Sequence, residues 1–392
     1  MNIKNFAISF LSTALVMLSS CSGSDGLEAS GGQGSGDASK VKRTILVYAV
    51  NKSSLATDFP ADLQEMKNAM QSVDNSKYRL LLFRTDSNDK CGLYEYASVN
   101  DEPDFKQVVS YPRDVASTHP DRIRRVIDDA LALYPNSEYD LFFWGHGMSW
   151  TPYFTDHTLK NVQQRAYGGE YNSNGYTTDW TDIDDLANAI PDGKFNLIWM
   201  DCCYMAGIEP VYEFKGKCDT FVGYPTEVWS AGMPYDKVLP LIFLENRNIP
   251  QAAEVFYDSY SSQRSPVTVA VIDMNSLEDF AEMARNVIQS GPVQPEATSL
   301  LNYSRTSASP YYDLRQFLKE KAVLNGAEFM NVAIDNGFAQ LVKYHAESDI
   351  DFNRRPWNKE NISGLSTHLY KGGELPAEQY YRKLKWYKRV YE

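Results

Sequence analysis

Two adjacent cysteines, Cys202 and Cys203, close an apolar run that begins at Phe195. A cysteine attacks as its thiolate, and a free thiol with a pKa of about 8.5 is mostly protonated at neutral pH. A nucleophilic cysteine therefore needs a base, which is usually a histidine. Of the five histidines, only His146 lies between glycines at the end of an apolar run. His146 and Cys203 are the candidate pair, and the alternative is that the cysteines are buried and unreactive.

Disulfide formation and metal binding by the cysteines fit the sequence less well. Cys91, Cys202, Cys203 and Cys218 show no CxxC spacing and are too sparse for a disulfide framework. Adjacent cysteines rarely bridge each other, because a disulfide needs converging Cβ vectors. No pairs of histidine or cysteine lie nearby at the spacing of zinc ligands. We therefore expect no metal and no cofactor.

Apolar segments of strand length alternate with helical segments in the first half of the chain. Strands are expected at residues 43–50, 78–85, 139–147 and 195–203, with helices at 55–73, 122–135 and 182–190 between them. This order predicts an α/β fold with a parallel sheet covered by helices. Ligands of such sheets bind beyond the carboxyl ends of the strands. His146 and Cys203 are both expected at that edge.

The second half of the chain is less regular, and we expect it to continue the same folded unit. A helix should follow the two cysteines, with strands at residues 219–225 and 265–274. Helices are expected at 277–289, 312–323 and 326–348, and a last strand at 364–373.

At the end of the strand expected at residues 195–203, the alternation of side chains puts Asp201 and Cys203 on one side and turns Cys202 to the other.

The segments FFWGHGMSW and LIWMDCCYMAGIEPVYEFK, at residues 142–150 and 197–215, together resemble the clostripain family of cysteine peptidases. That family has a W-x-H-G loop and a D-x-C-x-M stretch on strand ends. PYDKVLP, GLSTHLY and YYRKLKWYKRVY are similar to its later segments. The resemblance implies a caspase-like α/β/α sandwich with a mostly parallel central sheet, formed by residues 41–392. It also implies a cysteine endopeptidase with His146 and Cys203 as the catalytic pair.

The resemblance assigns further roles around this pair. Asp201 should line the pocket for the residue before the cut bond and select Arg or Lys by charge-assisted hydrogen bonds. The alternative is that Asp201 caps the helix that follows. Glu227 is a second candidate acid for the same pocket. The backbone amides of Gly147 and Cys203 should hold the oxyanion, and Met148 departs from the glycine-rich loop of the family.

Members of the family are also clipped between the histidine and the cysteine, after a basic residue. The corresponding interval here is polar and rich in glycine and asparagine, as is typical of an exposed loop. Lys160 and Arg165 are the candidate processing sites, with Lys160 the first choice. The alternative is an ordinary loop that is never cut.

The N-terminus reads as an export signal. An apolar run ends in Leu18-Ser-Ser-Cys21, which resembles a bacterial lipobox, so residues 1–21 are expected to be a lipoprotein signal peptide with Cys21 as the lipid attachment point. An ordinary signal peptide is the alternative. Residues 22–40 are rich in glycine and serine and are expected to form a flexible tether. The protein should therefore be exported and anchored by lipid to the bacterial cell envelope, at the outer membrane or cell surface.

Composition limits the partners. The net charge is -13 and no basic stripe is present, so we expect no nucleic-acid partner. Contact with a membrane should occur through the lipid anchor only. The expected partners are proteins or peptides with Arg or Lys before the cut bond. The competing function is a catalytically silent surface lipoprotein that keeps the fold as a binding module.

Overall fold

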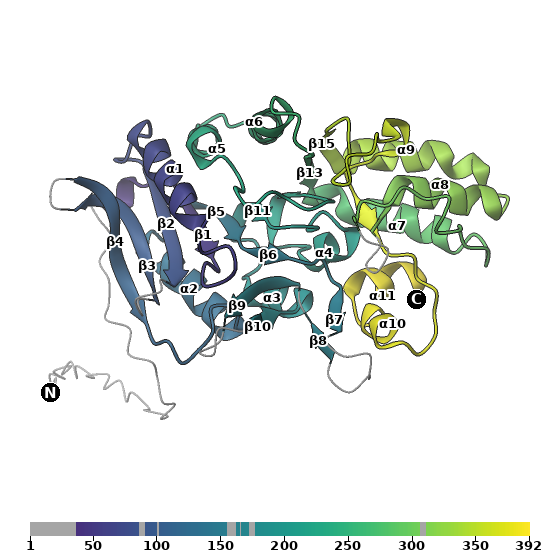
Figure 1. Ribbon diagram of the computed structural model, residues 1–392, viewed down its shortest axis with the longest axis horizontal. Coiled ribbons are helices and arrows are strands. Elements are labelled where there is room, and N and C mark those ends of the chain that lie inside the picture. Colours follow the sequence, from purple (N-terminus) through teal and green to yellow (C-terminus); the bar gives the residue numbers. More distant parts are fainter. Residues whose placement is uncertain are drawn as a thin grey trace, which may run out of the picture.

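A computed structural model describes residues 37–85, 91–99, 102–154, 162–164, 166–171, 177–305 and 311–392. Its largest sheet has nine strands (Figure 1). In spatial order they are β15 (Val342–Glu347), β13 (Thr268–Asp273), β12 (Cys218–Gly223), β11 (Phe195–Asp201), β5 (Glu138–Trp144), β1 (Arg43–Ala49), β2 (Tyr78–Thr85), β3 (Cys91–Val99) and β4 (Glu102–Tyr111).

The centre of this sheet is parallel and both of its edges are antiparallel. Strands β12, β11, β5, β1 and β2 pair in parallel. Antiparallel pairing joins β13 and β15 at one edge and β3 and β4 at the other. All of the nine strands except β3 and β13 therefore run in the same direction, and the expected mostly parallel sheet is confirmed.

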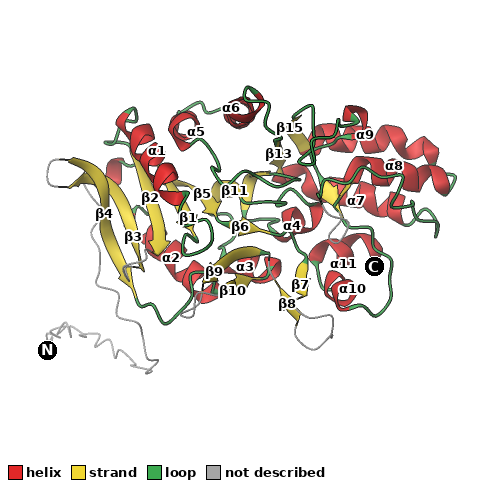
Figure 2. Ribbon diagram, in the orientation of Figure 1, coloured by secondary structure: helices red, strands yellow, loops and turns green. Residues whose placement is uncertain are grey.

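Helices cover both faces of the sheet (Figure 2). In β1, Leu46 and Tyr48 contribute to one core and Ile45 and Val47 to the other, because successive side chains of a strand point to opposite faces. The first core also contains side chains of α2 (Pro120–Leu133), α3 (Ile183–Ala189), α4 (Ile208–Glu213), α7 (Leu277–Ile288), α8 (Leu314–Leu324), α9 (Asn331–Leu341), α10 (Pro376–Tyr381) and α11 (Lys385–Tyr391). The second contains α1 (Phe59–Gln71), α5 (Tyr235–Phe243) and α6 (Ile249–Ser261). This is the expected α/β/α sandwich.

The segment between β5 and β11 contains short strands where the sequence predicted a loop. β6 (His146–Gly147), β9 (Tyr167–Tyr171) and β10 (Thr177–Thr181) form a small antiparallel sheet. β7 (Pro152–Phe154) and β8 (Val162–Gln164) pair beside it. The two expected processing residues, Lys160 and Arg165, lie outside the described residues. The small sheet holds His146 at the edge of the large one.

Two predictions for the second half of the chain are wrong. The helix expected over residues 326–348 ends at Leu341, and the chain continues as the edge strand β15. Backbone pairing with β13 overrides the local helical pattern there. Of the strand expected at 364–373, only β16 (Ser366–Thr367) forms, paired with β14 (Tyr312–Asp313).

The residues of the predicted N-terminal signal and tether lie mostly outside the described residues. Cys21 and the first part of the expected tether belong to the segment before Asp37. The last residues of that tether form a short 3-10 helix, η1 (Ala38–Lys40), directly before β1. Among the described helices, none combines the length and the apolar character that a membrane crossing requires.

Candidate active site

The two strand ends that carry the predicted catalytic pair lie next to each other. β5 and β11 are parallel neighbours, and Trp144 is paired with Asp201 in their register. His146 and Cys203 each follow two residues later, so both leave the sheet at its carboxyl edge. A Cβ added at Gly147 would clash with the carbonyl oxygen of Cys203 and would lie 3.1 Å from its amide nitrogen. A glycine at 147 therefore permits the two backbones to touch.

A cavity of about 310 Å³ opens at this edge. It is lined by four of the residues predicted from the sequence, namely His146, Asp201, Cys203 and Glu227. The rest of its wall is formed by Leu55, Trp144, Gly145, Val228, Trp229, Ser230, Gly232, Arg305 and Phe352. The expected base, nucleophile and acids thus face one space that is large enough for a side chain of a substrate.

His146 is contacted by residues of two different segments. Its Nε2 atom lies 2.7 Å from the Oγ of Ser54, in the loop after β1. The ring also packs near Trp180, with the two ring centres 6.0 Å apart. Burial lowers the pKa of His146, so the imidazole is neutral at physiological pH and able to accept a proton. No hydrogen bond joins the described side chains of His146 and Cys203, which is common before substrate binds.

Cys203 is half-buried and protonated at rest. Its Sγ accepts a hydrogen bond from the backbone N–H of Val228, with an N to S distance of 3.4 Å. Burial raises the pKa of the Cys203 thiol to about 11, and the charges of Glu227 and Asp201 add to that rise. The N–H of Val228 and the cation of Arg305 act in the opposite direction. The thiolate must therefore form through a base during the reaction.

Cys202 points away from the cavity, as strand alternation predicted. Its side chain is fully buried in the first core, and its Sγ lies 3.5 Å from the carbonyl oxygen of Phe143. Burial raises the pKa of the Cys202 thiol well above its ordinary value. Cys202 therefore has the environment of a small core residue, which is the role expected for it.

Asp201 is a buried carboxylate held by three donors. It accepts hydrogen bonds from the backbone N–H of Met233 at 3.0 Å and from the hydroxyls of Tyr235 at 3.1 Å and Tyr224 at 3.2 Å. The first helix after it, α4, begins at Ile208 with Gly207 as its N-cap. The alternative that Asp201 caps this helix is therefore wrong.

The charge of Asp201 persists at neutral pH. Burial raises its pKa to about 6, against the effect of its three hydrogen bonds. A second buried acid, Asp62, accepts a hydrogen bond at 2.7 Å from the Nε1 of Trp144, which lines the cavity. Burial and the neighbouring charge of Asp201 raise the pKa of Asp62 to about 8. Asp201 is thus the ionised member of this buried pair at pH 7.

Glu227 already has a cationic partner. The Nε of Arg305 donates to Glu227 at 2.5 Å, and both side chains line the cavity. The Glu227 side chain is 15% exposed and that of Arg305 is 52% exposed. Arg305 takes one carboxylate oxygen of Glu227, and the other, Oε2, is buried without a hydrogen bond to a described residue. Of the two acids predicted from the sequence, Asp201 is the one that has no basic side chain bonded to it among the described residues.

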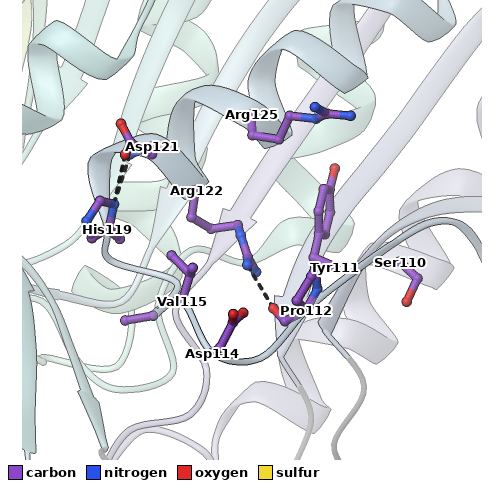
Figure 3. Close-up of a pocket in the computed structure, with 10 residues that line it drawn as sticks. Ser110, Tyr111, Pro112, Asp114, Val115, His119, Asp121, Arg122 and Arg125 are labelled. Atoms are coloured by element: carbon purple, nitrogen blue, oxygen red, sulfur yellow. Dashed lines mark hydrogen bonds and ion pairs between the residues drawn. The ribbon is translucent and has the colours of Figure 1, made fainter. Parts of the chain in front are cut away.

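The other described histidines lie elsewhere. His119 is the N-cap of α2, where its Nδ1 accepts the N–H of Asp121 at 3.2 Å. It borders a different cavity of about 460 Å³ near Arg122 (Figure 3). His345 contacts a glutamate on β15, and the Nε2 of His368 lies 3.0 Å from Glu378. The structural role expected for these three residues fits their positions, and His157 lies outside the described residues.

Several residues of the site were missed by sequence reasoning. Ser54, Tyr224 and Arg305 contact the predicted residues but belong to no motif that we identified, and Tyr235 lies in the segment PYDKVLP, where no role was assigned to it. The loops after β1 and β12 both follow strands of the parallel core, so the rule that such loops form the ligand site could have pointed to Ser54 and to residues 224–232. No comparable signal marks Arg305.

Proteins of known structure share this fold. The model of the clostripain family matches residues 47–349. The chain is similar to a secreted C11 cysteine protease from Bacteroides thetaiotaomicron in complex with an irreversible peptide inhibitor, with 25% identity over 89% of this chain and 99% of that chain and a TM-score of 0.76. An inactive zymogen C11 protease from Parabacteroides distasonis is 23% identical, with a TM-score of 0.75 over 90% of this chain and 99% of that chain. No curated protein matches the sequence.

Proposed function

Because the chain belongs to the clostripain family of cysteine peptidases, we propose that it cleaves peptide bonds after Arg or Lys through His146 and Cys203. The observation that best supports this proposal is the shared cavity at the carboxyl edge of the sheet. A neutral base, a thiol and an ionised acid face the same space there. These are the groups that acyl transfer from a basic residue requires.

The reaction would proceed in two steps. His146 accepts the proton of Cys203, and the thiolate attacks the carbonyl carbon, so a C–S bond forms while the carbonyl electrons move to oxygen. The amides of Gly147 and Cys203 hold this oxyanion; the Cys203 amide makes no other hydrogen bond among the described residues. The protonated His146 then gives its proton to the leaving nitrogen as the C–N bond breaks. Water, deprotonated by His146, releases the acyl group as a carboxylic acid.

Asp201 would select the residue before the cut bond. Its carboxylate lies behind Gly232, where an added Cβ would come within 2.8 Å of a carboxylate oxygen. A guanidinium or ammonium entering the cavity would meet a charge that is already desolvated and held by three donors. Such a charge needs little reorganisation to bind a cation, so it favours basic side chains over neutral ones of the same length.

A matched pair of peptides tests this selectivity. Two fluorogenic peptides that differ only in Arg or citrulline before the cut bond present the same shape with and without a charge. We expect kcat/KM to be roughly 10- to 150-fold higher for the arginine peptide, since a hydrogen bond to a charged group contributes about 1.5–3 kcal/mol. Equal cleavage of both peptides, or cleavage of neither, would contradict the proposed specificity.

The competing function was a catalytically silent binding module. Membership in a family of cysteine peptidases favours the enzyme. The cavity supports the same choice, because a binding module has no need for a neutral histidine and a cysteine on adjacent strand ends. A silent protein would cleave neither of the two peptides.

The enzyme should also cut its own chain between His146 and Cys203. The candidate bonds follow Lys160 and Arg165, in the segment between β7 and β9. Expression of residues 22–392 should yield two fragments on a denaturing gel, with a new N-terminus at Asn161 or Ala166. The Cys203→Ala variant should remain a single chain under the same conditions. A fully active wild-type enzyme that stays intact would show that no such step is used.

The proposed location is the bacterial cell envelope, with a lipid on Cys21. The support for it is the lipobox-like segment and the glycine- and serine-rich residues that follow. Cell fractionation checks this point. The wild-type protein should sediment with membranes and be released by detergent, whereas Cys21→Ala should be found in the soluble fraction. Equal sedimentation of both proteins would argue against the anchor.

A further inference from the structure

The proposed base of the enzyme has one hydrogen-bond partner among the described residues, and that partner is Ser54. Ser54 lies in the loop after β1, the strand that pairs with β5 on the side opposite to β11. The loop thus reaches His146 from the side away from Cys203. We propose that Ser54 is a positioning residue that fixes the orientation of His146 and stabilises its protonated form. This inference rests on the proposed role of His146 as the base.

The packing around the imidazole decides which nitrogen can act. A Cβ added at Gly169 would lie 3.0 Å from the Cδ2 of His146, so that carbon faces the backbone of β9. The neighbouring Nε2 faces the Oγ of Ser54 at 2.7 Å. This edge of the ring is therefore occupied by protein. Nδ1, on the other edge, makes no hydrogen bond to any described residue and is the nitrogen left for Cys203.

A neutral imidazole accepts a proton only on the nitrogen that carries no hydrogen. For Nδ1 to take the proton of the Cys203 thiol, the resting hydrogen must be on Nε2. The Oγ of Ser54 can accept that hydrogen, and it can equally donate to Nε2 in the other tautomer, so the contact orients the ring and leaves Nδ1 directed at Cys203. When Nδ1 gains the proton, both nitrogens become donors and the same oxygen also stabilises the cation. The Sγ–H bond breaks and the Nδ1–H bond forms. The hydrogen on Nε2 remains bonded to that nitrogen and hydrogen-bonded to the Oγ of Ser54.

Ser54 is not needed for the shape of its own loop. Its side chain is exposed, and the hydroxyl makes no other hydrogen bond to a described residue. The loop is held instead by the preceding residue, Ser53, which is buried. The Oγ of Ser53 accepts the N–H of Leu55 at 3.2 Å, and its carbonyl oxygen accepts the N–H of Ala56 at 3.1 Å. Removal of the Ser54 hydroxyl should therefore leave the backbone in place.

The test compares kcat and KM for a lysine peptide in the wild type, Ser54→Ala, Ser54→Thr and Thr57→Ala. Ser54→Ala should lower kcat by roughly 10- to 100-fold, which is part of the 10²–10⁴-fold that a general base contributes, while KM changes less than about twofold. Ser54→Thr keeps the hydroxyl and should restore most of kcat. Thr57→Ala removes an exposed hydroxyl from the same loop and should behave as the wild type.

Two outcomes would overturn the inference. A Ser54→Ala enzyme with wild-type kcat, measured beside an inactive His146→Ala enzyme, would show that the base needs no help from Ser54. A Ser54→Thr enzyme as slow as Ser54→Ala would show that the hydroxyl is not the active feature. Failure of the proposed function looks different, because the wild type would then cleave no lysine peptide, or His146→Ala would keep the activity of the wild type.

Discussion

Replacing Cys203 by alanine should lower kcat/KM on peptide substrates by on the order of 10⁴-fold or more, since the variant has no atom that can form the acyl-enzyme. Cys203 borders the cavity together with His146, and its Sγ is held by the N–H of Val228. The fold should survive, because the side chain is half-buried and belongs to neither of the two large cores. Steady-state kinetics and a thermal melt on the same sample measure both effects.

The neighbouring cysteine is the matched control. Cys202→Ala removes a thiol of the same size one residue away, but that thiol is buried in the first core. The variant should retain most of the activity and should lose some thermal stability, because a buried sulfur atom is replaced by a small void. An active Cys203→Ala enzyme beside an inactive Cys202→Ala enzyme would reverse the assignment of the nucleophile.

The second large effect is expected for Asp201→Asn. Cleavage after Arg or Lys should fall roughly 10- to 150-fold, which corresponds to the loss of a charge-assisted contact of about 1.5–3 kcal/mol. Reaction of Cys203 with a small neutral thiol reagent should change much less. Parallel loss of cleavage and of thiol reactivity would show instead that Asp201 maintains the structure of the site.

The pH dependence of this variant provides an independent check. Because burial raises the pKa of Asp201 to about 6, KM for arginine peptides should fall as the pH rises through 6 in the wild type and should lack that step in Asp201→Asn. The effect on stability has the opposite sign. The folded state binds the Asp201 proton more tightly than the unfolded state does, so stability present at low pH is lost as the pH rises through the folded pKa. Asp201→Asn should therefore melt no lower than the wild type at pH 8.

The elements that carry the reaction could be predicted because their patterns are local. Continuous apolar runs at β1, β2, β5 and β11, separated by helices, are typical of a parallel sheet. Because ligands bind at the carboxyl ends of parallel strands, His146 and Asp201 could be predicted to lie at one edge of the sheet. The alternation of side chains along a strand predicted that Cys202 and Cys203 point to opposite sides. The structure confirms that arrangement, with Trp144 opposite Asp201 in the register of β5 and β11.

What escaped prediction depends on contacts between distant segments. Ser54 lies 92 residues before His146 in the sequence, and a single serine in a polar loop has no periodic pattern around it. Arg305 reaches Glu227 from a connection between helices α7 and α8, which is far away in sequence. β15 was read as helix because its residues continue the pattern of α9, and pairing with β13 decides otherwise. Tertiary packing, rather than local propensity, determines the structure at these positions.

The roles of Cys203 as nucleophile and of Asp201 as selector can be measured together, as the mass of the tryptic peptide that contains both cysteines after treatment with a lysine-terminated peptidyl acyloxymethyl ketone. We expect one adduct per chain, located on Cys203 by fragmentation, and no adduct with the same reagent carrying norleucine in place of lysine. Norleucine keeps the aliphatic stem and removes the charge that Asp201 should recognise. An adduct on Cys202, equal labelling by both reagents, or no labelling of either cysteine would contradict these roles.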